Sequence, residues 1–104
     1  MMKGVKVKAP SFDGQMDPTK FLDWLVDMDH YFEWYDMSDK RRVRFAKMKL
    51  LDQAKLYWNR QENLLSRHGR ILMITWNEMK EHLRDEYVLI SHRKWLLYQW
   101  EQLV

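Results

Sequence analysis

The sequence predicts an all-α fold, a small helical bundle of four to five helices with an extended N-terminal segment. Three observations carry this prediction. Only 3 Gly and 2 Pro interrupt the 104 residues, and both Pro precede Thr19. Apolar residues recur at helical spacing along most of the chain. Six Trp, five Tyr and eight Met supply bulky core side chains, and a chain of this length can bury about two-thirds of the surface it exposes when unfolded.

The first 17 residues are expected to form the extended segment and a turn. Val5 and Val7 alternate with basic residues ahead of an Ala-Pro pair, a pattern typical of a short edge strand. Asp13-Gly14 is a turn signal. Asp17-Pro18 then starts a helix, with Asp as the N-cap and Pro at the first helical position, where its missing N–H is not needed.

The first helix is expected from Pro18 to Tyr35, and its acids and aromatics lie on opposite sides at about 100° per residue. The acids therefore do not converge on a pocket, which argues against a catalytic pair. Leu22, Val26 and Trp34 are apolar but lie off the core face. They form a candidate contact surface, the alternative being that a neighbouring segment covers them. The expected core face is Phe21, Trp24, Leu25, Met28, Tyr31, Phe32 and Tyr35.

The second helix, expected from Asp39 to Leu51, is strongly basic. Between Asp13 and Asp39 the chain has 8 acids and one base, whereas between Lys40 and Arg70 it has 10 bases and two acids. Such a molecule can attract copies of itself head to tail, although two solvated faces of opposite sign are an equal alternative. The candidate basic face, also a possible phosphate contact, is Lys40, Arg41, Arg42, Arg44, Lys47 and Lys49.

The third and fifth helices are each expected to start after a capping residue, and the fourth helix is expected to start with a capping box. Asp52 is expected to cap the third helix. Thr75 and Glu78 have the spacing of a capping box, and Ser91 is expected to cap a fifth helix from Trp95 to Leu103. The residues expected to be buried together are Trp24, Phe32, Trp58, Trp76 and Leu83.

No catalytic or cofactor motif is visible. The four His are scattered without an HExxH pair, and there is no Cys, no phosphate-binding glycine loop and no GxSxG elbow. We therefore expect no enzyme, no metal and no cofactor. No apolar run approaches the ~20 residues of a membrane helix, and the first residues lack the apolar stretch of a signal peptide. With no Cys to form disulfides, these features favour a cytoplasmic, intracellular protein.

An ordered series of motifs runs from about residue 5 to residue 90. It comprises Phe12-Asp13-Gly14, Asp17-Pro18, Phe21-Leu22-Asp23-Trp24-Leu25, Tyr31-Phe32-Glu33, Lys47-Met48-Lys49-Leu50, Ala54-Lys55-Leu56-Tyr57-Trp58, Thr75-Trp76 and Leu83-Arg84-Asp85-Glu86-Tyr87. In order and spacing this series resembles the Gag capsid domain of gypsy-type long-terminal-repeat retrotransposons, in a plant-like style. It is also similar to domesticated capsid lobes such as that of the neuronal activity-regulated cytoskeleton-associated protein.

The chain departs from the family pattern in two places. The family usually has Gly just before the helix that carries Ala54, where this chain reads Leu51-Asp52-Gln53. It also often has Pro near Leu89-Ile90, and without that Pro the fourth helix can run on into the segment around Trp95.

The resemblance implies a capsid-like lobe at residues 18–90, with residues 91–104 starting a second lobe. Its relatives self-associate into particles that enclose the RNA of the element. The usual RNA ligand of the family is a zinc knuckle that this chain lacks, so RNA is expected to bind only indirectly or weakly. One alternative is a domesticated adaptor that binds short peptides beside the extended segment, and another is a basic nucleic-acid-binding module.

The last residues are apolar on almost every side of a helical projection, which predicts either an interface or burial against the bundle. We expect a homo-oligomer, a dimer or higher. The candidate self-association or peptide-groove residues are Val5, Val7, Phe12, Leu22, Val26, Trp34, Leu96, Leu97, Trp100 and Leu103.

Overall fold

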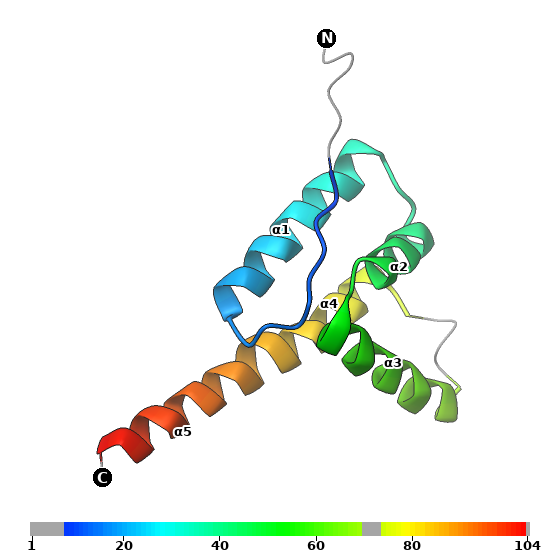
Figure 1. Cartoon of the computed structure of the whole chain (residues 1–104). Helices are drawn as coiled ribbons and strands as arrows, with labels where there is room; N and C mark the ends of the chain where they lie inside the picture. The colour runs from blue at the N-terminus through cyan, green and yellow to red at the C-terminus, as the bar shows by residue number, and fades with distance from the viewer. Residues whose placement is uncertain (1–7, 70–73, 104) are drawn as a thin grey trace.

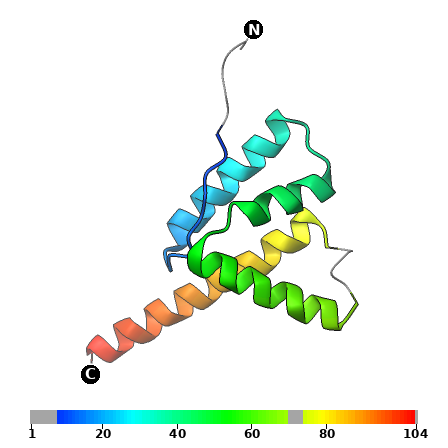
Figure 2. The same cartoon turned by 45° about the vertical axis from the view of Figure 1, so that its right-hand side comes forward.

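The computed structural model describes residues 8–69 and 74–103, and it confirms the all-α prediction. Within these residues the helices are α1 (Pro18–Trp34), α2 (Asp39–Met48), α3 (Asp52–Arg67), α4 (Trp76–Arg84), the π-helix η2 (Asp85–Ile90) and α5 (Ser91–Leu103). Helices α1 to α4 pack into a body, and α5 continues the line of α4 away from it (Figures 1 and 2). Val5 and Val7 lie outside the described residues.

An extended segment, residues 8–17, lies along α1 and closes the body against the link between α2 and α3 (Figure 1). The backbone N–H of Phe12 donates to the carbonyl of Lys49 at 2.9 Å, and the N–H of Leu51 donates to the carbonyl of Phe12 at 2.8 Å. The indole Nε1 of Trp24 donates to the carbonyl of Pro10 at 2.9 Å. These bonds connect the extended segment to α1 and to the link between α2 and α3.

The body has one core, and all five residues predicted to be buried together are in it. Tyr35, which was predicted to face the core, is exposed because it is the C-cap of α1, where the chain turns away. Helical spacing also predicts Leu64 on the core side of the third helix, and this prediction is wrong because Leu64 is 48% exposed. The buried apolar residues are Phe12, Phe21, Trp24, Leu25, Met28, Phe32, Met37, Ala46, Leu50, Ala54, Trp58, Trp76, Met79, Leu83 and Tyr87.

α1 ends in a Schellman motif built on an aspartate. The N–H of Met37 donates to the carbonyl of Phe32 at 3.0 Å, and the N–H of Asp36 donates to the carbonyl of Glu33 at 3.2 Å. Asp36 has φ 47°, the left-handed conformation that this motif requires and that Gly usually supplies. Burial of Met37 in the core fixes the exit direction of the chain.

The link between α2 and α3 differs from the sequence prediction. α2 ends at Met48 rather than Leu51, because Leu50 pairs with Phe12 in an isolated parallel bridge. Asp52 does not cap α3: the N-cap is Leu51, which makes no side-chain cap bond. Asp52 itself has φ 51°, so it takes the left-handed turn at which Gly is favoured.

The start of α4 confirms the predicted capping box. Thr75 Oγ1 accepts the N–H of Glu78 at 3.1 Å, and the Glu78 carboxylate accepts the N–H of Thr75 at 3.2 Å. Asp39, at the start of α2, also accepts the N–H of Trp76 at 3.1 Å. Ser91 was wrongly predicted to cap a separate helix: no Pro or Gly interrupts the stretch, and α4, η2 and α5 follow one another without a break.

Candidate functional site

The most exposed apolar surface of the described residues is on α5. Leu96, Leu97 and Trp100 are 48%, 63% and 67% exposed, and Trp95 and Tyr98 are also more than half exposed. α5 leaves the body and makes no fold-back onto it (Figures 1 and 2). The alternative in which this helix packs against its own bundle therefore does not describe this structure. Leu103 is the last residue of α5.

A second apolar surface, the α1 strip, consists of Leu22, Val26 and Trp34. All three side chains are about half exposed, and the extended segment does not cover them. Leu22 and Val26 are one turn apart and adjoin each other, whereas Trp34 lies at the far end of the helix. Phe12, in contrast, is 4% exposed and packs in the core.

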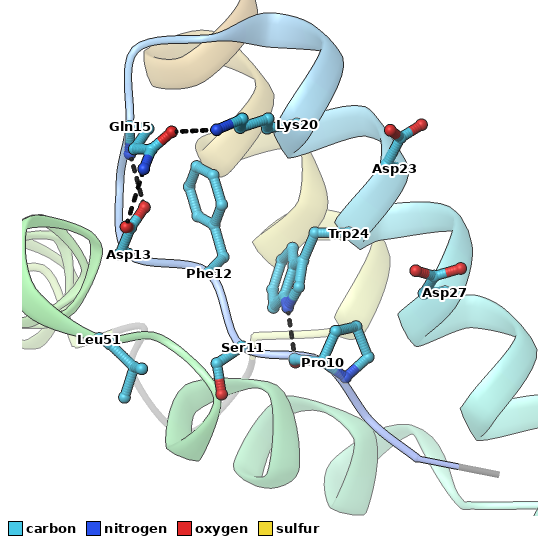
Figure 3. A pocket seen from close by; sticks show the side chains of 10 residues that line it. All are labelled: Pro10, Ser11, Phe12, Asp13, Gln15, Lys20, Asp23, Trp24, Asp27 and Leu51. Carbon is cyan, nitrogen blue, oxygen red and sulfur yellow. Dashed lines mark hydrogen bonds between the residues drawn. The ribbon is translucent and has the colours of Figure 1, made fainter.

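Between the extended segment and α1 lies an open groove of about 400 Å³, here called the N-terminal groove (Figure 3). Lys20 Nζ donates to Gln15 Oε1 at 2.7 Å, and the N–H of Gln15 donates to Asp13 Oδ1 at 3.0 Å, which holds one end of the groove. Asp23 and Asp27 stand on α1 along the other side. The lining residues are Pro10, Ser11, Phe12, Asp13, Gln15, Lys20, Asp23, Trp24, Asp27 and Leu51.

The charge of this groove is mostly negative, with three carboxylates against the single ammonium of Lys20. Its floor is aromatic, because Phe12 and Trp24 both line it. This charge favours a cationic group over an anionic one. Leu22 and Val26 do not line the groove, so the structure separates two sets of residues that the sequence grouped together.

The predicted basic face is divided between internal contacts and free cations. Arg42 Nε donates to the carbonyl of Met37 at 2.9 Å, and its guanidinium lies 5.7 Å from the centre of the Phe32 ring. Lys47 forms an ion pair of 2.7 Å with Glu62 on α3.

Lys49 lies 5.6 Å from the centre of the Phe45 ring. Lys40, Arg41 and Arg44 are exposed, and no ion pair within the described residues holds them. Half of the basic face is therefore available to a partner.

Asp29 is a structural residue that the sequence interpretation missed. Its carboxylate accepts the indole N–H of Trp76 at 2.8 Å and pairs with the ammonium of Lys80 at 3.3 Å. That ammonium also lies 5.6 Å from the centre of the Trp76 ring. At about 100° per residue Asp29 falls at the edge of the core face, beside Phe32. Its position next to the core face could have distinguished Asp29, from the sequence alone, from the solvent-exposed acids of α1.

Two tyrosines lie where η2 leaves the body. The hydroxyl of Tyr57 donates to the carbonyl of His82 at 2.8 Å. Burial raises the pKa of Tyr57 well above its usual range, and Glu86 raises it further. Burial and then Glu86 raise the pKa of Tyr87 to about 12. Both phenols therefore stay protonated at neutral pH and act in packing and hydrogen bonding.

The described residues, 8–69 and 74–103, hold no group of three or more His, Cys, Asp or Glu that could bind a metal ion. None of their helices is long and apolar enough to cross a bilayer. The surfaces described above are the apolar helix α5, the α1 strip, the acidic N-terminal groove and the three free cations of α2.

Comparison with known families gives one match. A model described as the N-terminal capsid-like domain of the retrotransposon-derived protein PEG10 matches residues 6–88. This range covers the extended segment, α1 to α4 and most of η2. Searches of curated proteins and of solved structures returned no match.

Proposed function

The chain belongs to the family of retrotransposon-derived, PEG10-type N-terminal capsid-like domains, and on that premise we propose that it is a structural lobe that self-associates. It is a capsid-like domain of a retrotransposon-derived Gag protein. The assembly that we propose is a particle, built in the cytoplasm, that encloses the RNA of the element. Its chemistry is contact rather than catalysis.

The observation that carries the proposal is the exposure of α5. From Trp95 to Trp100 every residue of α5 except Gln99 is apolar. Such a surface requires a partner, and in this structure the body does not supply one. Contiguous exposed apolar surface of this kind marks an interaction site. A capsid is built from many copies of one lobe, so the partner that we propose for α5 is a second copy of the chain.

Light scattering after size exclusion tests the proposal. Leu96→Asp with Trp100→Asp is expected to convert an oligomer into a monomer of unchanged helicity, because neither side chain is part of the core. Lys94→Gln with Gln102→Asp makes the same change in net charge on the far side of the same helix and is the matched control. An oligomer that persists in the first variant contradicts a role for α5, and a chain that is monomeric at every concentration contradicts self-association.

The division of charge supports a second contact between copies. Acidic α1 and the free cations of α2 have opposite sign, so one copy can attract the other through them. We expect about 0.5 M salt to weaken association by screening. Arg41→Glu with Arg44→Glu is expected to do the same at low salt. Arg42 is a poor choice for this test because its side chain also holds the turn after α1.

We propose that RNA is enclosed by the assembly and is bound by this lobe only weakly. The three free cations of α2 offer few phosphate contacts, and each contact contributes salt-sensitive affinity. A gel shift at increasing salt measures this directly. Tight binding that survives physiological salt would instead favour the basic nucleic-acid-binding module.

The N-terminal groove favours a second candidate function, the binding of short peptides. The supporting observation is its aromatic floor beside three carboxylates. We expect selection from a displayed peptide library to enrich extended sequences with Lys or Arg. Asp23→Asn with Asp27→Asn is expected to abolish the binding of such peptides, whereas Asp36→Asn, outside the groove, is expected to leave it unchanged.

A further inference from the structure

We propose that the cavity at the point where α5 leaves the body binds a small organic acid, whose carboxylate accepts hydrogen bonds from Arg60 and Tyr87. The walls of this cavity come from the extended segment, α3, η2 and the start of α5. Its volume is about 240 Å³, below the roughly 300–1,000 Å³ of pockets for drug-sized ligands. Binding at this site is independent of the proposed self-association and does not require it.

Tyr87 supplies a buried hydrogen-bond donor to this cavity. Its side chain lines the cavity and is 2% exposed. The neighbouring Tyr57 donates its hydroxyl proton to the carbonyl of His82 at 2.8 Å, whereas the hydroxyl of Tyr87 makes no hydrogen bond within residues 8–69 and 74–103. Burial and then Glu86 raise the pKa of Tyr87 to about 12, so this hydroxyl carries its proton at neutral pH. A buried donor requires an acceptor, and a ligand in the cavity can provide one.

Two cations from different helices line the same cavity. Arg60 lies on α3 and Lys94 in the first turn of α5, and neither forms an ion pair with another described residue. Burial raises the pKa of Tyr57 and of Tyr87, and the charge of Arg60 partly offsets this shift in both. The guanidinium therefore lies near both phenols. Guanidinium N–H groups bind the two oxygens of a carboxylate together, and a carboxylate that also reaches Lys94 connects the body to α5.

The charge balance of the cavity favours a ligand with one negative charge. Among the described residues that line it, Glu86 is the single carboxylate, and no ion pair with a described residue neutralises it. Two cations and one carboxylate leave a net charge of +1, which suits a monocarboxylate better than a phosphate dianion. Met16 and Tyr57 add apolar surface to the lining, so the acid can carry a short alkyl chain.

Saturation-transfer NMR on the full chain, with butyrate as the probe, tests the site. We expect saturable binding of butyrate and none of butylammonium, which has the same alkyl chain and the opposite charge. Arg60→Gln and Tyr87→Phe are each expected to raise the dissociation constant for butyrate at least about tenfold, the effect of one lost hydrogen bond to a charged group. Tyr87→Phe is also expected to keep the melting temperature of the free chain, because its hydroxyl has no partner among the described residues. Arg67→Gln, an exposed base of α3 outside the cavity, is the matched control.

Glu86→Gln is expected to act in the opposite direction and to lower the dissociation constant for butyrate severalfold, because it removes a like charge beside the ligand. Unchanged or weaker binding in this variant would contradict the charge argument.

Three other outcomes would overturn the proposal. One is the absence of saturable butyrate binding, and another is equal binding of butyrate and butylammonium, which would indicate adsorption to apolar surface. The third is tighter binding of the blocked peptide N-acetyl-Gly-Glu-Gly-amide than of butyrate, which would assign the site to an acidic side chain of a protein partner. Each of these outcomes leaves the proposed self-association through α5 untouched, since Arg60, Glu86 and Tyr87 are outside that helix.

Discussion

Trp58 and Trp100 are the same residue type on two helices of one chain, yet one is 1% exposed and the other 67%. Trp58 of α3 lies in the core of the body, with its ring 6.3 Å from that of His82 on α4. Trp100 lies on α5, which projects away from the body (Figure 2). The two helices have similar apolar content, so composition does not decide burial. The presence of neighbouring elements decides it, and the body supplies them for α3 but not for α5.

The strongest test of this difference between Trp58 and Trp100 is to replace each of them by Ala. Trp58→Ala is expected to destabilise the fold by about 3–5 kcal/mol, the range for large aromatic residues in a core. The buried Nε1 of Trp58 has no hydrogen-bond partner within the described residues, so the loss is one of packing. Trp100→Ala is the matched control, with no expected change in the free energy of unfolding of the monomer. Thermal denaturation of both variants at low concentration measures the difference, and equal melting temperatures would refute it.

The two described glycines with positive φ offer a second matched pair, with a smaller effect. Gly14 has φ 93°, and a Cβ there would lie 2.6 Å from the backbone nitrogen of Ala54. Gly14→Ala is therefore expected to cost about 2–4 kcal/mol, from backbone strain together with a forced shift of the start of α3.

Gly69 has φ 71°, and a Cβ there would have no heavy atom within 4 Å. Gly69→Ala is expected to cost only the strain, about 1 kcal/mol. Urea denaturation gives both free energies. If Gly14→Ala were no worse than Gly69→Ala, the close approach of the extended segment to α3 would not hold in solution.

Asp29 and Asp27 allow the same comparison, between a residue with internal partners and an exposed one, on the single helix α1. Asp29→Ala removes the acceptor of the Trp76 indole and the partner of Lys80, so we expect a loss of about 1–3 kcal/mol. Asp27→Ala removes an exposed acid with no such partner among the described residues and is expected to change stability by less than about 0.5 kcal/mol. Equal effects would mean that the contact between α1 and α4 does not depend on this polar link.

Helical periodicity was sufficient to predict the elements of the body. The core face of α1, the cap at Asp17 and the capping box at Thr75 each depend on local spacing, which the sequence contains directly. The ordered motifs from residue 5 to residue 90 likewise predicted the family that the match over residues 6–88 supports.

The errors lie where contacts between distant segments decide the outcome. The early end of α2 follows from the pairing of Leu50 with Phe12, 38 positions earlier in the chain. The structural role of Asp29, which the sequence interpretation missed, has the same origin, since it depends on a helix far along the sequence. The exposure of α5 could be stated only as one of two alternatives, because periodicity shows that a helix is apolar but not whether anything covers it.

The smallest expected effect concerns two aspartates at helix starts, Asp17 and Asp52, which the sequence assigned the same role. Asp17 has φ −125° and its carboxylate accepts the N–H of Thr19, so it is a true N-cap. Replacement of such a cap by Gly costs a few tenths of a kcal/mol. Asp52 has φ 51°, in the left-handed region that favours Gly.

Asp52→Gly is therefore expected to stabilise the fold by about 0.5 kcal/mol. Relief of the left-handed strain, at most about 1–2 kcal/mol for an L-residue and less for Asp, exceeds the added entropy of the unfolded chain, about 0.4–1 kcal/mol. Asp52→Ala keeps the strain, loses the tolerance of Asp for this conformation, and is expected to destabilise. The opposite signs of Asp17→Gly and Asp52→Gly in one denaturation series would show that backbone conformation, and not residue type, separates the two helix starts. Loss of stability in both would mean that Asp52 acts as a cap after all.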